Sequence, residues 1–314
     1  MLEAALIASR FLHHTATLIL FGVSIFPLYT YRGSTDFRMA QAHHPVHTIM
    51  RWAAFAALFS AVFWFMSVVS NMTGTLAGAL DREAARAVLS DTSFGSVWVA
   101  RFILAGIILV LATAGLKSHP KHLNWHLPVL CGALLISLAG VGHTQVEKGI
   151  GRILHMSADG LHLLAAGAWL GGLVSLFFLV ARGVRESSPV DNAEVSSAAL
   201  HFSGMGYIAV ASLIGSGLIN SWFLVGWFGN LATPYGRLLI VKLVLFAGML
   251  VLAALNRFFL VPRLIQAKAL DEHPVAALIK LRRHILGEQA LGIVVILIVS
   301  ALGTMEPAIN LSQG

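Results

Sequence analysis

Ionisable and metal-ligating side chains lie inside one long apolar run of this chain. His155, Asp159 and His162 occur at intervals of four and three residues between Arg152 and Arg182. On a helix these intervals place the three side chains on one face. Imidazole and carboxylate groups at membrane depth are costly, and they mark ion, proton or cofactor sites. The pattern therefore predicts a site of this kind.

The composition identifies the class of protein that must position these groups. Of 314 residues, 57% are hydrophobic and only 11% are charged, whereas soluble domains carry about 25% charged residues. Recurring apolar runs of about 20 residues predict an all-α, polytopic integral membrane protein with about eight transmembrane helices. The predicted spans are residues 3–30, 48–72, 95–116, 126–143, 153–181, 200–226, 236–262 and 277–304.

The connectors between these spans are short, so residues 1–314 are expected to form one transmembrane domain in a lipid bilayer. The longest connector, residues 73–96, has an amphipathic helical pattern that predicts an interfacial helix. The formal net charge of +7 comes from Lys and Arg in connectors. The positive-inside rule explains it without nucleic-acid binding. No Walker A motif occurs, so a transporter without its own ATPase is expected, and not an enzyme.

Loop charge sets the expected orientation. Lys and Arg are more numerous in the connectors after spans 1, 3, 5 and 7 than in those after spans 2, 4 and 6. The positive-inside rule places the first set inside, which leaves both termini outside. Spans 1 and 5 then run inward from the outer surface. Glycines in spans 5 and 6, among them Gly167, Gly171, Gly204, Gly206 and Gly215, are expected to permit close helix packing.

Further histidines are expected at the same depth in the membrane as His155, Asp159 and His162. At about 1.5 Å per residue, His162 lies roughly 15 Å below Arg152, near the middle of the bilayer. His13 and His14 of span 1 lie at a similar depth, whereas His143 ends span 4 at the outer mouth. His13 and His14 are about 100° apart on a helix, so only one of them is expected to face the site.

The ligand chemistry favours copper. Met156 adds a thioether beside His155. Imidazole suits several transition metals, and a soft thioether shifts the choice toward copper. Asp159 could ligate the metal, or hold the nearby His162 in its metal-binding tautomer. The predicted copper site comprises His13, His143, His155, Met156, Asp159 and His162.

Two other functions remain open at this point. Paired histidines on facing spans also suit a b-type haem in an intramembrane redox protein. A copper-binding factor could also hold the metal without transporting it. A single intramembrane histidine is, in addition, often a hydrogen-bonded packing residue.

Several polar residues lie outside the predicted site. Glu288 lies at the level of Arg257, so it either pairs with that residue or has a proton-relay or gating role. Arg101 and Lys242 lie near the outer ends of their spans, where long side chains can snorkel. Two groups of histidines at the inner side could form an exit site for the metal or contact headgroups: His43, His44 and His47, and His119, His122 and His126.

A series of short motifs runs along nearly the whole chain. It includes R-F-L-H at 10–13, G-H at 142–143, D-G-L-H-L-L-A-A-G-A-W-L-G-G-L at 159–173, S-G-L-I-N at 216–220, T-P-Y-G-R at 233–237, N-R-F-F-L-V-P-R at 256–263 and L-R-R-H-I-L-G-E at 281–288. In this order the motifs resemble the copper resistance protein D (CopD) family of bacterial inner-membrane proteins.

The resemblance implies an eight-span inner-membrane protein that handles copper and moves it from the periplasm into the cytoplasm. It also implies a separate periplasmic copper-binding partner of the CopC type. His13 matches the family position in span 1, and His14 is additional. The copper gradient, the membrane potential or protons would drive the movement, and a cation gains about 2.3 kcal/mol per charge per 100 mV.

Overall fold

The computed structural model describes residues 1–31, 46–114, 125–142, 148–186, 189–270 and 274–311, and these residues form helices joined by short turns. The elements are α1 (Leu2–Thr30), α3 (Val46–Thr73), η1 (Ala77–Leu80), α4 (Arg82–Asp91), α5 (Ser93–Thr113), α6 (His126–Ile136), η2 (Ser137–Gly140), α7 (Gly149–Ala166), η4 (Gly167–Gly171), α8 (Gly172–Glu186), α9 (Pro189–Leu224), η5 (Phe228–Ala232), α10 (Pro234–Leu255), η6 (Asn256–Leu260), α11 (Val261–Ala269), α12 (Val275–Leu302) and α13 (Ala308–Leu311).

The described residues contain seven helices that are long and apolar enough to cross a membrane. They correspond to seven of the eight predicted spans. The remaining predicted span is a shorter apolar helix, His126–Gly140. It covers roughly 20–25 Å, less than the approximately 30 Å of a hydrocarbon core. The predicted all-α membrane fold is confirmed.

Two of these spans contain a π-helical turn. The fifth predicted span is formed by α7, η4 and α8, and the seventh by α10, η6 and α11; η4 and η6 are π-helical. A π turn adds a residue to the local helical repeat and changes which side chains share a face beyond it. Both turns lie at positions that shape the buried sites described below.

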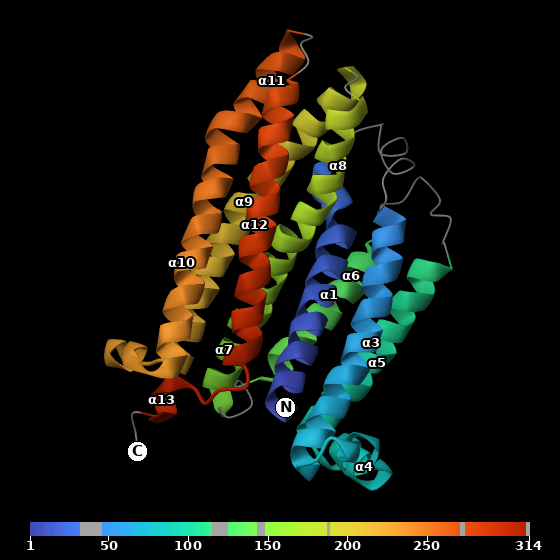
Figure 1. The fold of residues 1–314 in the computed structure, drawn as a ribbon, viewed down its shortest axis with the longest axis vertical. Helices are drawn as coiled ribbons and strands as arrows, with labels where there is room; N and C mark the ends of the chain where they lie inside the picture. Colours follow the sequence, from blue (N-terminus) through green and yellow to red (C-terminus); the bar gives the residue numbers. More distant parts are fainter. Residues whose placement is uncertain (32–45, 115–124, 143–147, 187–188, 271–273, 312–314) are drawn as a thin grey trace.

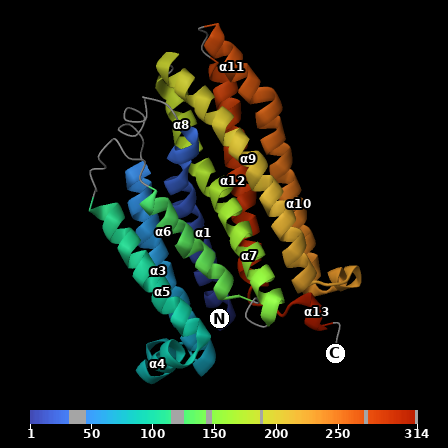
Figure 2. The same cartoon turned by 180° about the vertical axis from the view of Figure 1, so that it is seen from behind.

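The helices form an elongated bundle with both ends of the chain at the same end (Figure 1). Following the predicted orientation, this end is called the outer end. The helix α4, in the predicted interfacial segment, also lies there (Figure 2). It begins at Asp81, whose carboxylate accepts hydrogen bonds from the backbone N–H groups of Glu83 (2.9 Å) and Ala84 (3.1 Å). This contact caps the helix.

Helix α1 joins two apolar cores. One core is built mainly from α1, α3, α5 and α6 and includes Trp64, Trp98 and Cys131. The other is built mainly from the segments η4 to α12 and includes Trp169 and Ile285. Because α1 packs against α3 and α6 as well as against η4, α8 and α12, its position fixes how the two groups of helices meet.

Glycines let the backbones of α1 and η4 touch. A Cβ atom on Gly22 would lie 2.3 Å from the carbonyl oxygen of Gly167 and 2.4 Å from Cα of Gly171. Only glycine fits such a contact, as the glycine pattern predicted for span 5. The same expectation is wrong for Gly204, Gly206 and Gly215, because a Cβ atom on any of them would have no neighbour within 4 Å.

Replacing Gly22 with Ala should therefore lower stability. The added methyl would meet backbone atoms, and overpacking of this kind costs about 1–3 kcal/mol or more. Gly106→Ala on α5 is the matched control, since a Cβ atom there has no neighbour within 4 Å and Ala favours a helix. Thermal unfolding in detergent should show a loss for the first variant only. Equal melting temperatures for the two variants would contradict the close contact.

Candidate functional site

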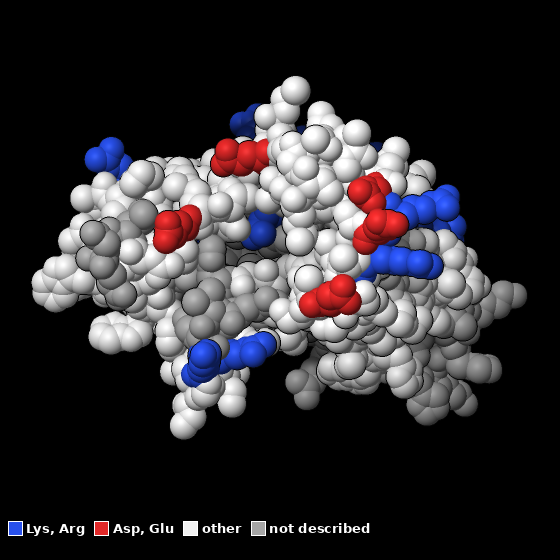
Figure 3. Space-filling view, turned by 90° about the horizontal axis from the view of Figure 1, so that it is seen from below, with Lys and Arg blue, Asp and Glu red and all other residues white. Residues whose placement is uncertain are grey.

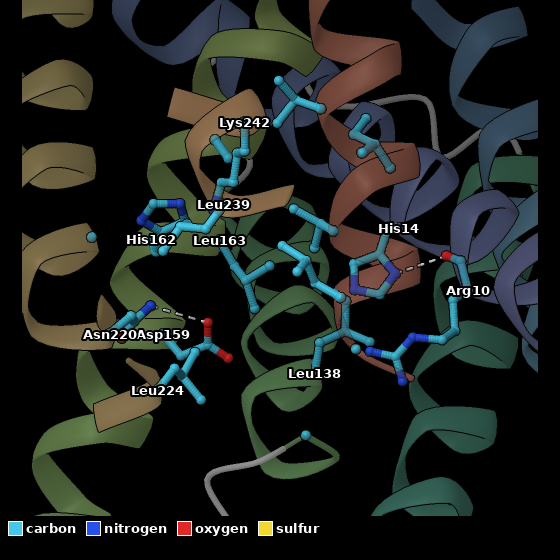
Figure 4. A pocket seen from close by; sticks show the side chains of 18 of the residues that line it. Arg10, His14, Leu138, Asp159, His162, Leu163, Asn220, Leu224, Leu239 and Lys242 are labelled. Carbon is cyan, nitrogen blue, oxygen red and sulfur yellow. Dashed lines mark hydrogen bonds between the residues drawn. The ribbon is translucent and has the colours of Figure 1, made fainter. Parts of the chain in front are cut away.

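A cavity of about 210 Å³ lies in the outer half of the bundle (Figure 4). Side chains from α1, α7, α9, α10 and α12 form most of its wall. We call it the outer cavity. Its polar lining residues are Arg10, His14, His155, Asp159, His162, Asn220, Ser221, Tyr235 and Lys242.

Three of the predicted site residues meet in this cavity. His155, Asp159 and His162 all line it, as expected for intervals of four and three residues on helix α7. The ring of His155 stacks on Phe223 of α9, with centroids 4.7 Å apart and planes 6° apart. The hydrophilic face of α7 is thus turned toward α9 and the cavity.

His14 supplies a metal-competent nitrogen from α1. Its Nδ1 atom lies 2.7 Å from the backbone carbonyl oxygen of Arg10, and a carbonyl only accepts, so Nδ1 carries the hydrogen. In the neutral ring the lone pair is then on Nε2. The backbone contact therefore holds His14 in the tautomer that binds metal through Nε2.

His162 is held in the same way by a hydroxyl group. Its Nδ1 atom lies 3.0 Å from Oγ of Ser216. The hydroxyl of Ser216 donates to the backbone carbonyl of Ser212, so it accepts from the imidazole N–H. The Nε2 atom of His162 again carries the lone pair. The predicted pairing of His162 with Asp159 is replaced by this bond to Ser216.

Asp159 is instead part of a charged group in the cavity. Its Oδ1 atom accepts a hydrogen bond of 3.4 Å from Asn220 (Figure 4). It also interacts electrostatically with Arg10 and Lys242. The two cations reduce the cost of one carboxylate in an apolar wall. The guanidinium of Arg10 lies 4.8 Å from the ring centre of Trp64, which adds a cation–π contact.

His13 points away from this cavity, into a separate network. Its Nδ1 atom lies 3.0 Å from Oγ of Ser60, whose hydroxyl donates to the backbone carbonyl of Ala57. Its Nε2 atom accepts from Arg101. Both ring nitrogens are therefore hydrogen-bonded to protein groups. Of the two neighbouring histidines, the structure places His14, not His13, at the cavity.

Arg101 is fully buried and does not snorkel, in contrast to the prediction. Besides its bond to His13, it donates to the backbone carbonyl of Leu134 at 3.0 Å and to the hydroxyl of Ser137. Its guanidinium carbon lies 4.9 Å from the ring centre of Trp98. The network ties α1, α5 and α6 together at membrane depth.

The remaining predicted ligands are Met156 and His143. Met156 does not line it, and its methyl group lies near Gly140. His143 lies outside the described residues, directly after Gly142 of the cavity wall. Among the residues that the structure describes, no three His, Cys, Asp or Glu side chains converge closely enough to hold a metal ion. Of the inner histidines, the structure describes only His47 and His126.

Sequence reasoning missed the residues that orient the ligands. Ser216 and Asn220 contact His162 and Asp159, and both lie in the S-G-L-I-N motif. Their interval of four residues places them on one face of α9. This spacing could have indicated that the two residues face the site together.

An apolar bundle with a cavity that contains charged and polar side chains at membrane depth defines a polytopic membrane protein with a candidate internal site. Comparison with known proteins identifies its family. Residues 1–153 match the family described as copper resistance protein D-like, N-terminal domain, and residues 197–302 match copper resistance protein D. No solved structure matches significantly.

The curated relatives agree with this assignment. The chain is 30% identical to inner membrane protein YebZ of Escherichia coli over 98% of this chain and 100% of the relative. It is 30% identical to copper resistance protein D of Pseudomonas syringae pv. tomato over 96% of each. Copper transport protein CutJ of Bacillus subtilis is 28% identical, over 79% of this chain and 45% of the relative. The chain therefore belongs to the copper resistance protein D family and is a multi-pass, copper-related inner-membrane protein.

The two histidines of α1 should respond differently to mutation. His13→Leu removes the acceptor for an N–H of Arg101, and an unsatisfied buried donor costs about 1–3 kcal/mol. His14→Leu leaves that network intact and only changes a cavity wall. Thermal unfolding in detergent should show the larger loss for His13→Leu. The assigned roles would be wrong if His14→Leu were the more destabilised variant.

Proposed function

We propose that this protein moves copper from the periplasm into the cytoplasm, and that the outer cavity is where the cargo first binds inside the membrane. The observation that carries the proposal is the pair of imidazoles on α1 and α7. His14 and His162 line one cavity, and each is held with its Nε2 lone pair available. The names of the relatives, copper resistance protein D and copper transport protein, support copper as the cargo.

The chemistry of the cavity suits an ion that stays only briefly. Imidazole nitrogen is a good ligand for copper, and two imidazoles give fewer ligands than a tight structural site uses. Among the described lining residues, Arg10 and Lys242 add two positive charges, and Asp159 is the one acidic residue. A cation bound there gains less than in a purely anionic site, and conduction requires binding that is weak enough to permit release.

The size of the cavity favours an ion over the alternative haem group. At about 210 Å³ it is smaller than the roughly 300–1,000 Å³ of common ligand pockets. His14 and His162 are therefore proposed as copper ligands. His155 and Asp159, which share the cavity, would complete or tune the coordination, and His143 is kept as the entry ligand that the sequence predicts. His13 and Met156 are not retained as ligands.

The position of the cavity and the membrane potential support inward transport. The cavity lies at the outer end, which the positive-inside rule assigns to the periplasm. A membrane potential that is negative inside favours inward movement of a cation by about 2.3 kcal/mol per charge per 100 mV. Both considerations support uptake.

A periplasmic copper-binding protein of the CopC type is proposed as the donor. The outer face that it would approach carries exposed acidic and basic side chains (Figure 3). The exposed acidic residues of this end are Glu3, Asp81, Glu83, Asp91 and Glu306. Mixed charge of this kind can orient a partner before copper is transferred.

Copper binding tests the site directly. His14→Ala and His162→Ala should each lower the copper retained per protein after dialysis, measured by elemental analysis. Ser216→Ala should keep the ligands but weaken affinity about 10–100-fold, because loss of a group that orients a metal-binding histidine has effects of that size. His201→Ala, at an exposed position of α9, is the matched control. Full copper retention in both His14→Ala and His162→Ala would refute the site.

Overexpression tests the direction. Cells that overproduce the protein should accumulate cytoplasmic copper and become more sensitive to it, as measured by metal analysis of fractionated cells and by growth. A double variant, His14→Ala with His162→Ala, should abolish both effects at equal expression. Lower cytoplasmic copper and higher tolerance on overexpression would show export or sequestration instead.

A further inference from the structure

A second cavity lies in the half of the bundle away from the chain ends. It measures about 400 Å³, and α8, α9, α10 and α12 supply most of its apolar wall. We call it the inner cavity. The lining residues that can form side-chain hydrogen bonds are Trp169, Ser203, Tyr207, Asn256, Arg257 and Glu288. Of these, Glu288 has no role in the copper site of the outer cavity.

Glu288 is 1% exposed, and both of its carboxyl oxygens accept hydrogen bonds from neutral donors. The indole N–H of Trp169 donates to Oε2 at 3.1 Å, and the amide of Asn256 donates to Oε1 at 2.8 Å. The sequence-based pairing with Arg257 is wrong, because the guanidinium of Arg257 donates to the hydroxyl of Tyr207 at 3.3 Å.

Both protonation states of Glu288 are therefore supported by its surroundings. Burial without a cation at hydrogen-bond distance favours the neutral acid. The two hydrogen bonds favour the carboxylate. The other titratable residues that line the cavity are Tyr207 on α9 and Arg257 on η6. The lining residues that η4, α8 and α10 contribute carry no charge. A group with such balanced surroundings can exchange a proton at modest cost.

The cavity also offers a connection toward the inner end. Nδ1 of His284, one helical turn before Glu288 on α12, lies 2.7 Å from Oδ1 of Asn256. Because an amide oxygen only accepts, the imidazole donates to it. His284 is partly exposed. Through Asn256, the hydrogen bonds of Glu288 thus extend to a titratable group nearer the inner surface.

Glu288 also holds the wall between the two cavities. Trp169 belongs to the π turn η4 and lines the inner cavity, whereas its neighbour Leu170 lines the outer cavity. Leu170 packs on Gly292 of α12, where an added Cβ atom would lie 2.4 Å from the leucine side chain. The second donor, Asn256, begins the other π turn, η6. Both π turns of the described chain thus supply a donor to one carboxyl group, and such turns are frequent at functional sites.

We propose that Glu288 is a proton-binding site that controls the wall between the outer and inner cavities. In the carboxylate form Glu288 accepts hydrogen bonds from Trp169 and Asn256. These bonds hold η4 in the arrangement that separates the two cavities. Binding of one proton converts COO⁻ to COOH, weakens one acceptor and releases η4, so that Leu170 and Trp169 move. The proton exchanges with the cytoplasmic side through the inner cavity. This control of copper passage rests on the proposed transport function, whereas proton binding itself does not.

Infrared difference spectroscopy of the purified protein tests proton binding. Spectra recorded between two pH values should contain the carbonyl band of a buried carboxylic acid, and Glu288→Gln should lack it. Trp169→Phe should retain the band at a shifted position, because one hydrogen bond is lost. Glu306→Gln, at an exposed position, is the control. Absence of the band in the wild type, or its persistence in Glu288→Gln, would overturn the proposal. If Glu288→Gln failed to fold, an unshifted band in Trp169→Phe would overturn it.

Copper uptake into right-side-out membrane vesicles tests the control of passage. Uptake by the wild type should change with the internal pH, and uptake by Glu288→Gln should not, although copper binding at the outer cavity stays intact. The same pH dependence in both would refute control by Glu288. Absence of uptake in the wild type would refute the proposed transport and leave the infrared result to decide on proton binding.

Discussion

The cost of a polar group in hydrocarbon governs the organisation of this protein. A polar side chain buried at membrane depth is costly without a partner, because hydrocarbon cannot supply the hydrogen bonds that water would. Arg101 meets this requirement with His13, Leu134 and Ser137. Glu288 meets it with Trp169 and Asn256. The partners come from different helices, so satisfying each polar group also fixes how those helices pack.

The same requirement separates structural from functional histidines. Both ring nitrogens of His13 are used by protein groups, which makes it part of the framework. In His14 and His162 only Nδ1 is used, and Nε2 keeps the lone pair that the proposed copper site requires. Two neighbouring residues of the same type on α1 thus have different surroundings, His13 in a hydrogen-bond network and His14 at the outer cavity.

The division into two cavities depends on close backbone packing. Contact between Gly22 and the π turn η4 brings α1 against the segment that carries Trp169 and Leu170. One of these residues lines each cavity. The wall is therefore thin, and it is built on an irregular helical turn rather than on a regular helix. This is the wall whose opening we propose Glu288 to control.

Much of this arrangement could be predicted from the sequence, since spans follow from apolar run length and the face of His155, Asp159 and His162 follows from helical periodicity. The choice between His13 and His14 could not. They differ by about 100° on one helix, and tertiary packing decides which side faces the cavity.

The hydrogen-bond partners of Glu288 could not be predicted from the sequence either. Matched depth in the membrane made Arg257 the expected partner, but Asn256, at the start of a π turn, donates to Glu288 instead, and Arg257 donates to Tyr207. The bond from His162 to Ser216 likewise depends on the approach of α9 to α7, which periodicity within one helix does not specify.

The central claim is that two imidazoles, from α1 and α7, bind copper in the outer cavity. X-ray absorption at the copper edge of the copper-loaded protein tests it most directly. The account predicts scattering from imidazole nitrogen without a sulfur ligand, and loss of this signal when His14 and His162 are both replaced by Ala. A sulfur-dominated spectrum, or an unchanged spectrum in the double variant, would contradict it.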